Sequence, residues 1–299
     1  MNIVITGGMG FIGHNLGRQL KAEGHTVTAL DDLRFVTDSL YNYRNAHSYD
    51  ELKIADCTRH DFNPDTKADV VIHLACHPNQ AAFDNAGLRT AWSNTTVSTN
   101  VVARWAVKQK AKLIYFSSSM VYGNWNGRIS EDAELAPVND YGRAKMFCEL
   151  AILETVTDYV IIRPTAVYGP GDNPRRLISK WINLAKAGQD IPVVDDVTSL
   201  DLTHVYDVCR GIKQILMYMP AQQTYNISAG TSVKLAEVAD YIISSTGSSS
   251  RIVYTGKETN MPDRGSLDIT KANKHLLYTP SWDWTNGLKE MIETHDKLL

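Results

Sequence analysis

Short apolar runs alternate with amphipathic stretches through the first two-thirds of the chain. Residues 2–6 form an apolar run, and the stretch 13–23 that follows has leucines at helical spacing and ends at Gly24. Strands that alternate with helices predict βαβ units, and right-handed crossovers between them favour a doubly wound parallel sheet. We expect the further strands at 26–30, 52–55, 70–74, 113–117 and 159–163, and the further helices at 94–109 and 141–155.

The pattern changes after Gly169, where prolines separate shorter elements. The sequence therefore predicts an α/β protein in which residues 1–169 form a Rossmann-like doubly wound domain and residues 170–299 form mainly a smaller C-terminal substrate-binding lobe. The chain is expected to return to the first domain around 201–229. In this later part we expect helices at 173–188, 207–219 and 235–245, and a short strand at 225–228.

The composition is that of an ordinary globular chain and argues against several partners. The 299 residues include 30 Lys and Arg against 33 Asp and Glu, so a nucleic-acid-binding protein, which usually has a basic excess, is not expected. No apolar run reaches the length of a membrane span, and the first residues lead into glycines rather than into a signal peptide. The four cysteines, at 57, 76, 148 and 209, lack metal-ligand or CxxC spacing, which predicts reduced thiols, a cytoplasmic protein and no metal site.

A glycine-rich turn lies between the first predicted strand and the first predicted helix. Gly7, Gly10 and Gly13 form a GxxGxxG pattern that includes Phe11 and Ile12. In such a turn the first glycine allows the sharp bend, the second lets the backbone approach a pyrophosphate, and the third lets the helix pack on the strand. Amides at the N-terminus of the helix favour the phosphate charge. Because strand, turn and helix occur in this order, we predict a dinucleotide site here.

An aspartate at the end of the second predicted strand indicates which dinucleotide binds. Asp31, followed by Asp32, stands where a carboxylate accepts both hydroxyls of the adenosine ribose and repels a 2′-phosphate. NAD is therefore favoured over NADP, and the nearby Arg34 is the one feature that favours NADP.

Two further segments carry acid–base chemistry. Tyr141 and Lys145 share one face of a predicted helix, and a neighbouring cation lowers the pKa of a phenol, which makes Tyr141 a candidate base. A tyrosine and a lysine four residues apart occur by chance in most proteins. The discriminating feature is the serine run 117–119 after a predicted strand, because a strand-end serine can hydrogen-bond the substrate oxygen whose proton the tyrosine handles.

Taken in order, the glycine turn, the strand-end aspartate, SSSMVYG and YGRAK resemble the extended short-chain dehydrogenase/reductases. The resemblance is to the branch that acts on nucleotide-diphosphate sugars and includes proteins similar to UDP-glucose 4-epimerase, and it covers essentially the whole chain. It implies that Ser118, three residues before Val121, is the catalytic serine beside Tyr141 and Lys145. It also implies cofactor contacts from Asp56, Cys57, Leu74, Ala75, Cys76, Asn94, Ser117 and Pro164, and substrate contacts from Ser118, Ser119, Thr165, Arg175 and Arg264.

The departures from the family pattern narrow the expected reaction. The family's 4,6-dehydratases carry an Asp-Glu pair directly after the hydroxyl residue, where this chain has Ser119 and Met120, and its decarboxylases carry a glutamate in place of Met120. The 4-epimerases and 4-keto reductases remain, because they work with serine, tyrosine and lysine alone.

The substrate half departs further from the pattern. Ala166, Leu200 and Met261 stand where the family has an asparagine and two arginines. A diphosphate needs cations, which Arg176 or the arginines named above can supply. An unusual nucleotide sugar is therefore compatible with this half.

The expected function is an NAD-dependent nucleotide-sugar 4-epimerase that oxidises C4 transiently and returns the same hydride. The first alternative is a 4-keto-sugar reductase or another sugar-nucleotide oxidoreductase with the same residues. The second is a non-catalytic NAD-binding sensor or scaffold, against which the intact Ser118, Tyr141 and Lys145 argue. The resemblance also implies a homodimer, in which the helices predicted at 94–109 and 141–155 pair across the interface.

Overall fold

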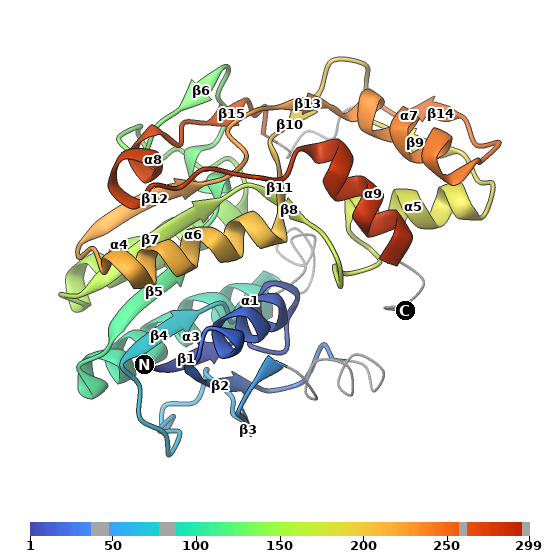
Figure 1. The fold of residues 1–299 in the computed structure, drawn as a ribbon. Coiled ribbons are helices and arrows are strands. Elements are labelled where there is room, and N and C mark those ends of the chain that lie inside the picture. The colour runs from blue at the N-terminus through green and yellow to red at the C-terminus, as the bar shows by residue number, and fades with distance from the viewer. Residues whose placement is uncertain (37–47, 78–87, 257–261, 295–299) are drawn as a thin grey trace.

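A seven-stranded parallel sheet forms the centre of the protein (Figure 1). The computed structural model describes residues 1–36, 48–77, 88–256 and 262–294. The first strand pairs with the second on one side and with the fourth on the other, so the chain winds outward in both directions from it. The predicted doubly wound α/β class is therefore confirmed. In sheet order the strands are β12 (Gln223–Ile227), β7 (Tyr159–Pro164), β5 (Lys112–Phe116), β4 (Val70–His73), β1 (Asn2–Thr6), β2 (Thr26–Asp31) and β3 (Glu51–Ile54).

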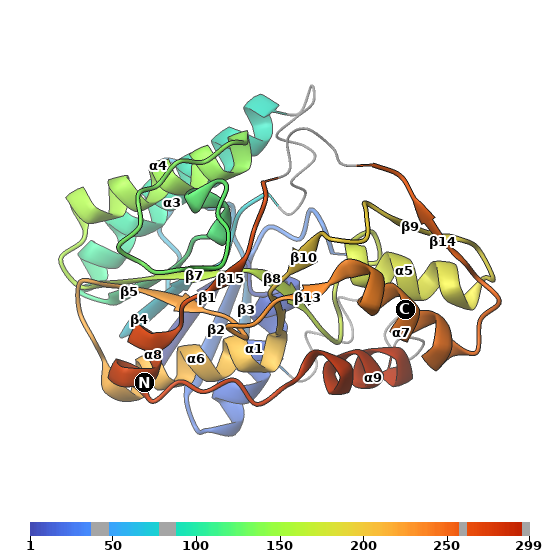
Figure 2. The same ribbon diagram turned by 90° about the horizontal axis from the view of Figure 1, so that it is seen from above.

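Helices cover both faces of this sheet (Figure 2). On one face lie α1 (Phe11–Ala22) and α6 (Val205–Tyr218), and on the other lie α3 (Leu88–Gln109) and α4 (Asp140–Thr155). Both faces of the central strands are buried, which is why β4 and β5 are mostly apolar, whereas the edge strand β3 (ELKI) is partly exposed.

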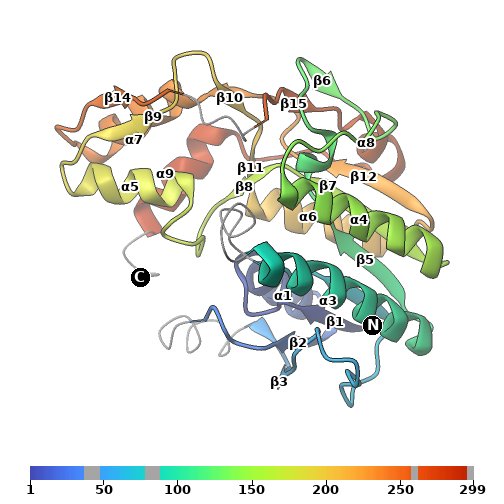
Figure 3. The same cartoon turned by 180° about the vertical axis from the view of Figure 1, so that it is seen from behind.

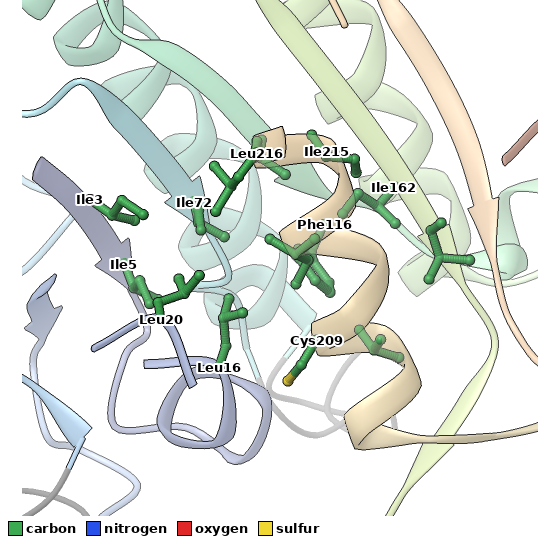
Figure 4. Close-up of a cluster of buried hydrophobic side chains, with 14 of the residues drawn as sticks. Ile3, Ile5, Leu16, Leu20, Ile72, Phe116, Ile162, Cys209, Ile215 and Leu216 are labelled. Carbon is green, nitrogen blue, oxygen red and sulfur yellow. The ribbon is translucent and has the colours of Figure 1, made fainter. Parts of the chain in front are cut away.

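Successive residues of the first strand point into different layers of the core. Ile3 and Ile5 pack with Leu16 of α1 (Figure 4), whereas Val4 packs with Val102 of α3. The two layers are separate clusters of buried side chains, one on each side of the sheet. This period of two is what a fully buried strand requires.

The second lobe combines helices with pairs of short strands (Figure 1). Its core includes Trp181, which is fully buried, together with Ile242 and Leu288. Its helices are α5 (Leu177–Lys186), α7 (Leu235–Thr246) and α9 (Trp284–Thr294), and its strand pairs are β9 (Ile191–Val193) with β14 (Ile252–Tyr254) and β10 (Ser199–Leu200) with β13 (Val233–Lys234).

The later part of the chain also returns to the sheet domain. Strand β12 joins the edge of the sheet, and α6 covers one face of it. Helix α8 (Thr270–Leu276) packs against α6 and β12. Two further strand pairs connect the parts, β8 (Ala166–Tyr168) with β11 (Leu202–His204) and β6 (Arg128–Ile129) with β15 (Ser266–Leu267). The boundary at residue 169 stays a prediction.

Two helix starts differ from the sequence prediction by four residues or more. The helix predicted from 94 already includes Leu88, and the helix predicted from 173 begins at Leu177. In the second case the Asn173 side chain accepts a hydrogen bond from the Arg175 amide at 2.9 Å, and such a local turn competes with helix formation. Among the described residues, no helix combines the length and the apolar character needed to cross a bilayer.

Candidate active site

The turn between β1 and α1 has room for glycine only. Gly7 has a φ of +68°, and a Cβ on it would lie 2.8 Å from the Ala75 amide nitrogen. A Cβ on Gly13 would lie 2.6 Å from the Gly7 carbonyl oxygen, so this glycine packs against the turn itself. The motif had instead suggested that it packs against the strand. Gly8, which the sequence analysis did not select, makes the close approach to the strand, because a Cβ on it would lie 2.6 Å from the Ala29 methyl group. Backbone is therefore exposed to a ligand at this turn without side chains in the way.

The first amides of α1 point out of this turn. Those of Phe11 and Ile12 have no carbonyl within the helix to bond, as is general for the first turn of a helix. Gly10 begins the helix as its N-cap residue, with no side-chain cap. An anionic group placed at this end is stabilised by the amides and by the helix dipole.

Asp31 lies at the end of β2 directly beside the turn. Its carboxylate accepts hydrogen bonds from the amides of Met9, at 3.0 Å, and Leu33, at 2.9 Å. Arg34 is ion-paired with Asp32 at 2.8 Å and with Asp56 at 2.9 Å. Two carboxylates thus compensate the charge of Arg34, the cation that the 2′-phosphate of NADP would need.

The glycine turn, the first amides of α1 and Asp31 form a cradle for a cofactor, and the segment after β3 forms its next wall. Burial raises the pKa of Asp56, but hydrogen bonds from Thr58 and the charge of Arg34 outweigh it and hold that pKa below its usual value. Burial, with the charges of Asp31 and Asp56, raises the pKa of the neighbouring Cys57 thiol to about 12, so the thiol is neutral. The turn, the ribose-side carboxylate and the helix N-terminus together fit a dinucleotide such as NAD.

The other predicted cofactor residues lie at the carboxyl ends of the central strands. Residues 74–76 follow β4, and the Leu74 amide continues the sheet by donating to the Thr6 carbonyl at 3.1 Å. Pro164 ends β7, Ser117 follows β5, and Asn94 is half-buried on α3. Parallel strands present their carboxyl ends at one edge of the sheet, so these residues border the edge where ligands of such folds bind.

The predicted catalytic residues come together from two elements. Ser118 caps a short 3₁₀ helix, η2 (Ser119–Tyr122), and its hydroxyl accepts from the Met120 amide at 3.2 Å. Tyr141 lies in the first turn of α4, which Asn139 caps, and the Ser118 side chain is near enough to lower the pKa of its phenol. Lys145 is buried and donates to the Phe116 carbonyl at 2.7 Å.

The distance between η2 and α4 is set by a glycine. A Cβ on Gly142 would lie 2.5 Å from the Met120 carbonyl oxygen, so a larger residue would push Tyr141 away from Ser118. The ammonium of Lys145 lies 5.9 Å from the centre of the Tyr141 ring and 5.0 Å from that of Tyr115.

The charge balance of this pair corrects one expectation. Burial raises the pKa of Tyr141, and the charge of Lys145 lowers it, but the net pKa of Tyr141 lies above its usual value rather than below it. The sequence pattern showed the cation but could not show the loss of solvent. Burial lowers the pKa of Lys145, and its acidic neighbours, Cys76 and Tyr141 first, outweigh it, so the lysine stays charged.

Several buried polar atoms have no hydrogen-bond partner in the part of the chain that the structure describes. The hydroxyls of Ser117 and Ser119 are buried and make no hydrogen bond there. Arg264, just before β15, is half-buried as a whole, but its Nε atom is buried and unpartnered, and burial lowers the pKa of this arginine to about 10. A desolvated guanidinium nitrogen without a partner is costly unless an acceptor binds beside it.

Of the two adjacent arginines at the start of α5, the structure brings the one that was not selected toward the site. Arg176 is ion-paired with Asp172 at 3.0 Å, lies over the Phe11 ring, and its charge lowers the pKa of Tyr141. Both arginines are exposed, the Arg176 side chain to 44%, and the contact with Phe11 and the effect on Tyr141 are those of Arg176. The dipeptide marked a cationic position, but only the structure shows which of the two acts on the site. Thr165, between β7 and β8, is half-buried.

Comparisons with known proteins agree with this geometry. A dTDP-glucose 4,6-dehydratase of Streptomyces niveus is 29% identical over 98% of this chain and 92% of its own length. An uncharacterized UDP-glucose epimerase, YtcB, of Bacillus subtilis is 26% identical over 98% of this chain and 97% of its own. The solved structure of MoeE5 in complex with UDP-glucuronic acid and NAD covers 100% of both chains with a TM-score of 0.88 and 25% identity. The sequence model of the NAD dependent epimerase/dehydratase family matches residues 3–228, most of the chain, which therefore belongs to this family of NAD-dependent enzymes.

Proposed function

We propose that the protein is a 4-epimerase of a nucleoside-diphosphate sugar. The observation that carries this proposal is the set of Ser118, Tyr141 and Lys145 in mutual reach, followed by two positions that hold no acid. Ser119 and Met120 are 1% and 3% exposed, so a hydroxyl and a thioether occupy the places directly after the catalytic serine.

The residues at these two positions argue against dehydration. Elimination of water from a 4-keto sugar needs a base that removes the C5 proton and an acid that protonates the departing C6 hydroxyl. Neither Ser119 nor Met120 is an acid or a base at neutral pH, and the thioether of Met120 lies 3.9 Å from the Asn139 amide nitrogen that donates to it. The similarity to a dehydratase therefore extends to the fold and the cofactor cradle, and we assign a reaction at C4 alone.

In the proposed reaction each residue has one task. Tyr141 takes the proton of the C4 hydroxyl and returns it after the sugar has turned over, while Ser118 hydrogen-bonds the C4 oxygen. Lys145 supplies a fixed positive charge that stabilises the phenolate of Tyr141. Bound NAD would supply a hydride acceptor and the positive charge of its ring.

The residues that would hold the cofactor are those of the cradle. We place the pyrophosphate at the turn of Gly7, Gly10 and Gly13 and the adenosine ribose at Asp31. The two carboxylates that bind Arg34 support NAD as the preferred form.

We expect NAD to bind at least about tenfold more tightly than NADP, because Asp31 repels a 2′-phosphate and Arg34 is already paired. Titration calorimetry of the apoprotein with both cofactors measures the ratio. Asp32→Asn is the matched variant, since it releases one partner of Arg34 and should narrow the preference. Equal affinities in the unmodified protein would show that Arg34, not Asp31, governs the choice.

A diphosphate is the part of the substrate that the structure supports best. Arg264 is half-buried, and its Nε atom has no hydrogen-bond partner among the described residues, while Arg176 adds a second positive charge near Tyr141. The similar MoeE5 structure contains UDP-glucuronic acid, a nucleotide sugar. The unpartnered hydroxyls of Ser117 and Ser119 are suited to bond sugar oxygens.

The proposed reaction predicts epimerisation without net reduction. With nucleotide sugars labelled with deuterium at C4 and a catalytic amount of NAD, we expect the C4 epimer to form, the label to stay at C4, and the absorbance of reduced nicotinamide to show no net change. Consumption of stoichiometric NADH with a 4-keto sugar, and no interconversion of C4 epimers, would replace the epimerase by a reductase.

We also propose a cytoplasmic homodimer. The four cysteines are unpaired, as in a reducing compartment. Helices α3 and α4 lie side by side (Figure 3), and their outer surfaces expose Val107, Phe147, Leu150 and Leu153 to between 48% and 52%. A second copy of the chain would bury this apolar surface.

We expect Leu150→Glu to halve the mass in solution, because it places a charge in the proposed interface. Light scattering after gel filtration measures the mass, and Met217→Glu, an equally apolar but distant exposed position on α6, is the control. A monomeric unmodified protein would overturn the proposal.

A further inference from the structure

An ion pair is buried on the same face of α4 as the proposed catalytic tyrosine and lysine. Glu149 follows Lys145 by four residues, as Lys145 follows Tyr141, so the three side chains form one row along the helix. Glu149 binds Arg163 of β7 through two parallel hydrogen bonds, Nη2 to Oε2 at 2.6 Å and Nε to Oε1 at 3.0 Å. The two side chains are 2% and 7% exposed. The row therefore alternates phenol, ammonium, carboxylate and guanidinium, with the last supplied from the sheet.

Further contacts fix Arg163 in place. Its Nη1 donates to the Tyr122 hydroxyl at 3.0 Å and to the Glu131 carbonyl at 3.1 Å. Tyr122 in turn donates to the Asn226 side chain at 2.8 Å. Tyr122 ends η2, the element that Ser118 begins, so the guanidinium binds both elements that carry the catalytic hydroxyls.

The position of Glu149 raises an electrostatic problem that Arg163 solves. An unpaired carboxylate one helical turn from Lys145 would attract the ammonium and oppose its effect on the phenol one turn in the other direction. Burial strengthens such interactions, because water no longer screens them. Two hydrogen bonds with Arg163 satisfy the carboxylate and offset its charge, so that Glu149 adds less to the pKa of Lys145 than Cys76 and Tyr141 do.

We infer that Glu149 and Arg163 are positioning residues for catalysis: their ion pair withholds the carboxylate from Lys145, so that the ammonium charge acts on Tyr141. This inference rests on the proposed role of Tyr141 as the base. It also accounts for a buried ion pair that apolar residues of similar volume could replace without loss of stability.

The other titratable groups around the pair are weak competitors. Burial raises the pKa of Tyr122 to about 12 despite the charge of Arg163, so this phenol stays protonated. Burial also raises the pKa values of Cys148, beside Glu149 on α4, and of Tyr115 on β5. Glu131 is the remaining acid that faces the network; burial raises its pKa, and its carboxylate accepts from the Asn226 amide at 2.7 Å.

The pKa of Tyr141 in the NAD-loaded enzyme tests the inference. It is read from phenolate absorbance as the difference between each variant and the same variant carrying Tyr141→Phe. Glu149→Gln leaves Arg163 as an uncancelled cation about 12 Å along the helix from the phenol, so we expect the pKa of Tyr141 to fall by roughly one unit. Glu149→Gln combined with Arg163→Met removes both charges, and we expect the pKa to return close to that of the unmodified enzyme.

The control separates charge from structural damage. Glu154→Gln makes the same change at an exposed position of the same helix and should leave the pKa unchanged. An unchanged pKa in Glu149→Gln, or an equal shift in the single and double variants, would overturn the inference. These outcomes are independent of turnover, whereas undiminished turnover in Tyr141→Phe would instead reject the proposed function.

Discussion

Replacement of Tyr141 by phenylalanine is expected to lower turnover by about 10²–10⁴-fold, the usual loss when a general base is removed. The ring and its packing remain, and only the hydroxyl on the Ser118 side disappears. Affinity for NAD should therefore be nearly unchanged. Steady-state kinetics and cofactor titration on the same preparation measure the two effects separately.

Tyr115→Phe is the matched control for this experiment. Its ring lies 5.0 Å from the ammonium of Lys145, closer than that of Tyr141, but its hydroxyl is buried on β5. We expect near-native turnover, because the ring contact with Lys145 is kept. Equal losses in both variants would show that the aromatic surroundings of Lys145 matter, and not the proton of Tyr141.

Arg264→Met is expected to have two opposite effects. Affinity for a nucleoside diphosphate should fall by about 10- to 100-fold, because a charge-assisted hydrogen bond to the ligand is lost. In the absence of ligand the melting temperature should rise, because the folded protein no longer buries a guanidinium nitrogen that has no hydrogen-bond partner among the described residues. Calorimetry with UDP and a thermal melt of the ligand-free protein give the two quantities.

Arg175→Met provides the comparison, since this arginine lies just before α5 of the second lobe and is exposed. It should leave both the affinity and the melting temperature unchanged. If Arg264→Met binds UDP as tightly as the unmodified protein does, the diphosphate lies elsewhere. If instead its melting temperature falls, Arg264 has a stabilising partner and is not held ready for an anion.

Local patterns in the sequence were enough for the fold class and the cofactor cradle. The strand at 2–6, the glycines after it and Asp31 at the end of the second strand are readable because turn geometry and strand–helix alternation depend on neighbouring residues only. The same holds for Tyr141 and Lys145, whose spacing places them on one face wherever the helix lies.

The charge state of the site was decided by tertiary structure. Burial of Tyr141 outweighs the effect of Lys145 on its pKa, and Arg176 rather than Arg175 acts on the site. Neither effect has a local signature, because solvent exclusion depends on which distant segments pack over a side chain.

The same distinction separates two arginines. Arg163 and Arg264 look alike in the sequence, yet Arg163 is paired with a glutamate from another element, whereas the Nε atom of Arg264 has no hydrogen-bond partner among the described residues. Sequence by itself determined which chemical groups are present and in what order along the chain. Only the folded structure decided which charges cancel and which remain for a ligand, because a charge is compensated through space, by residues far away in the sequence.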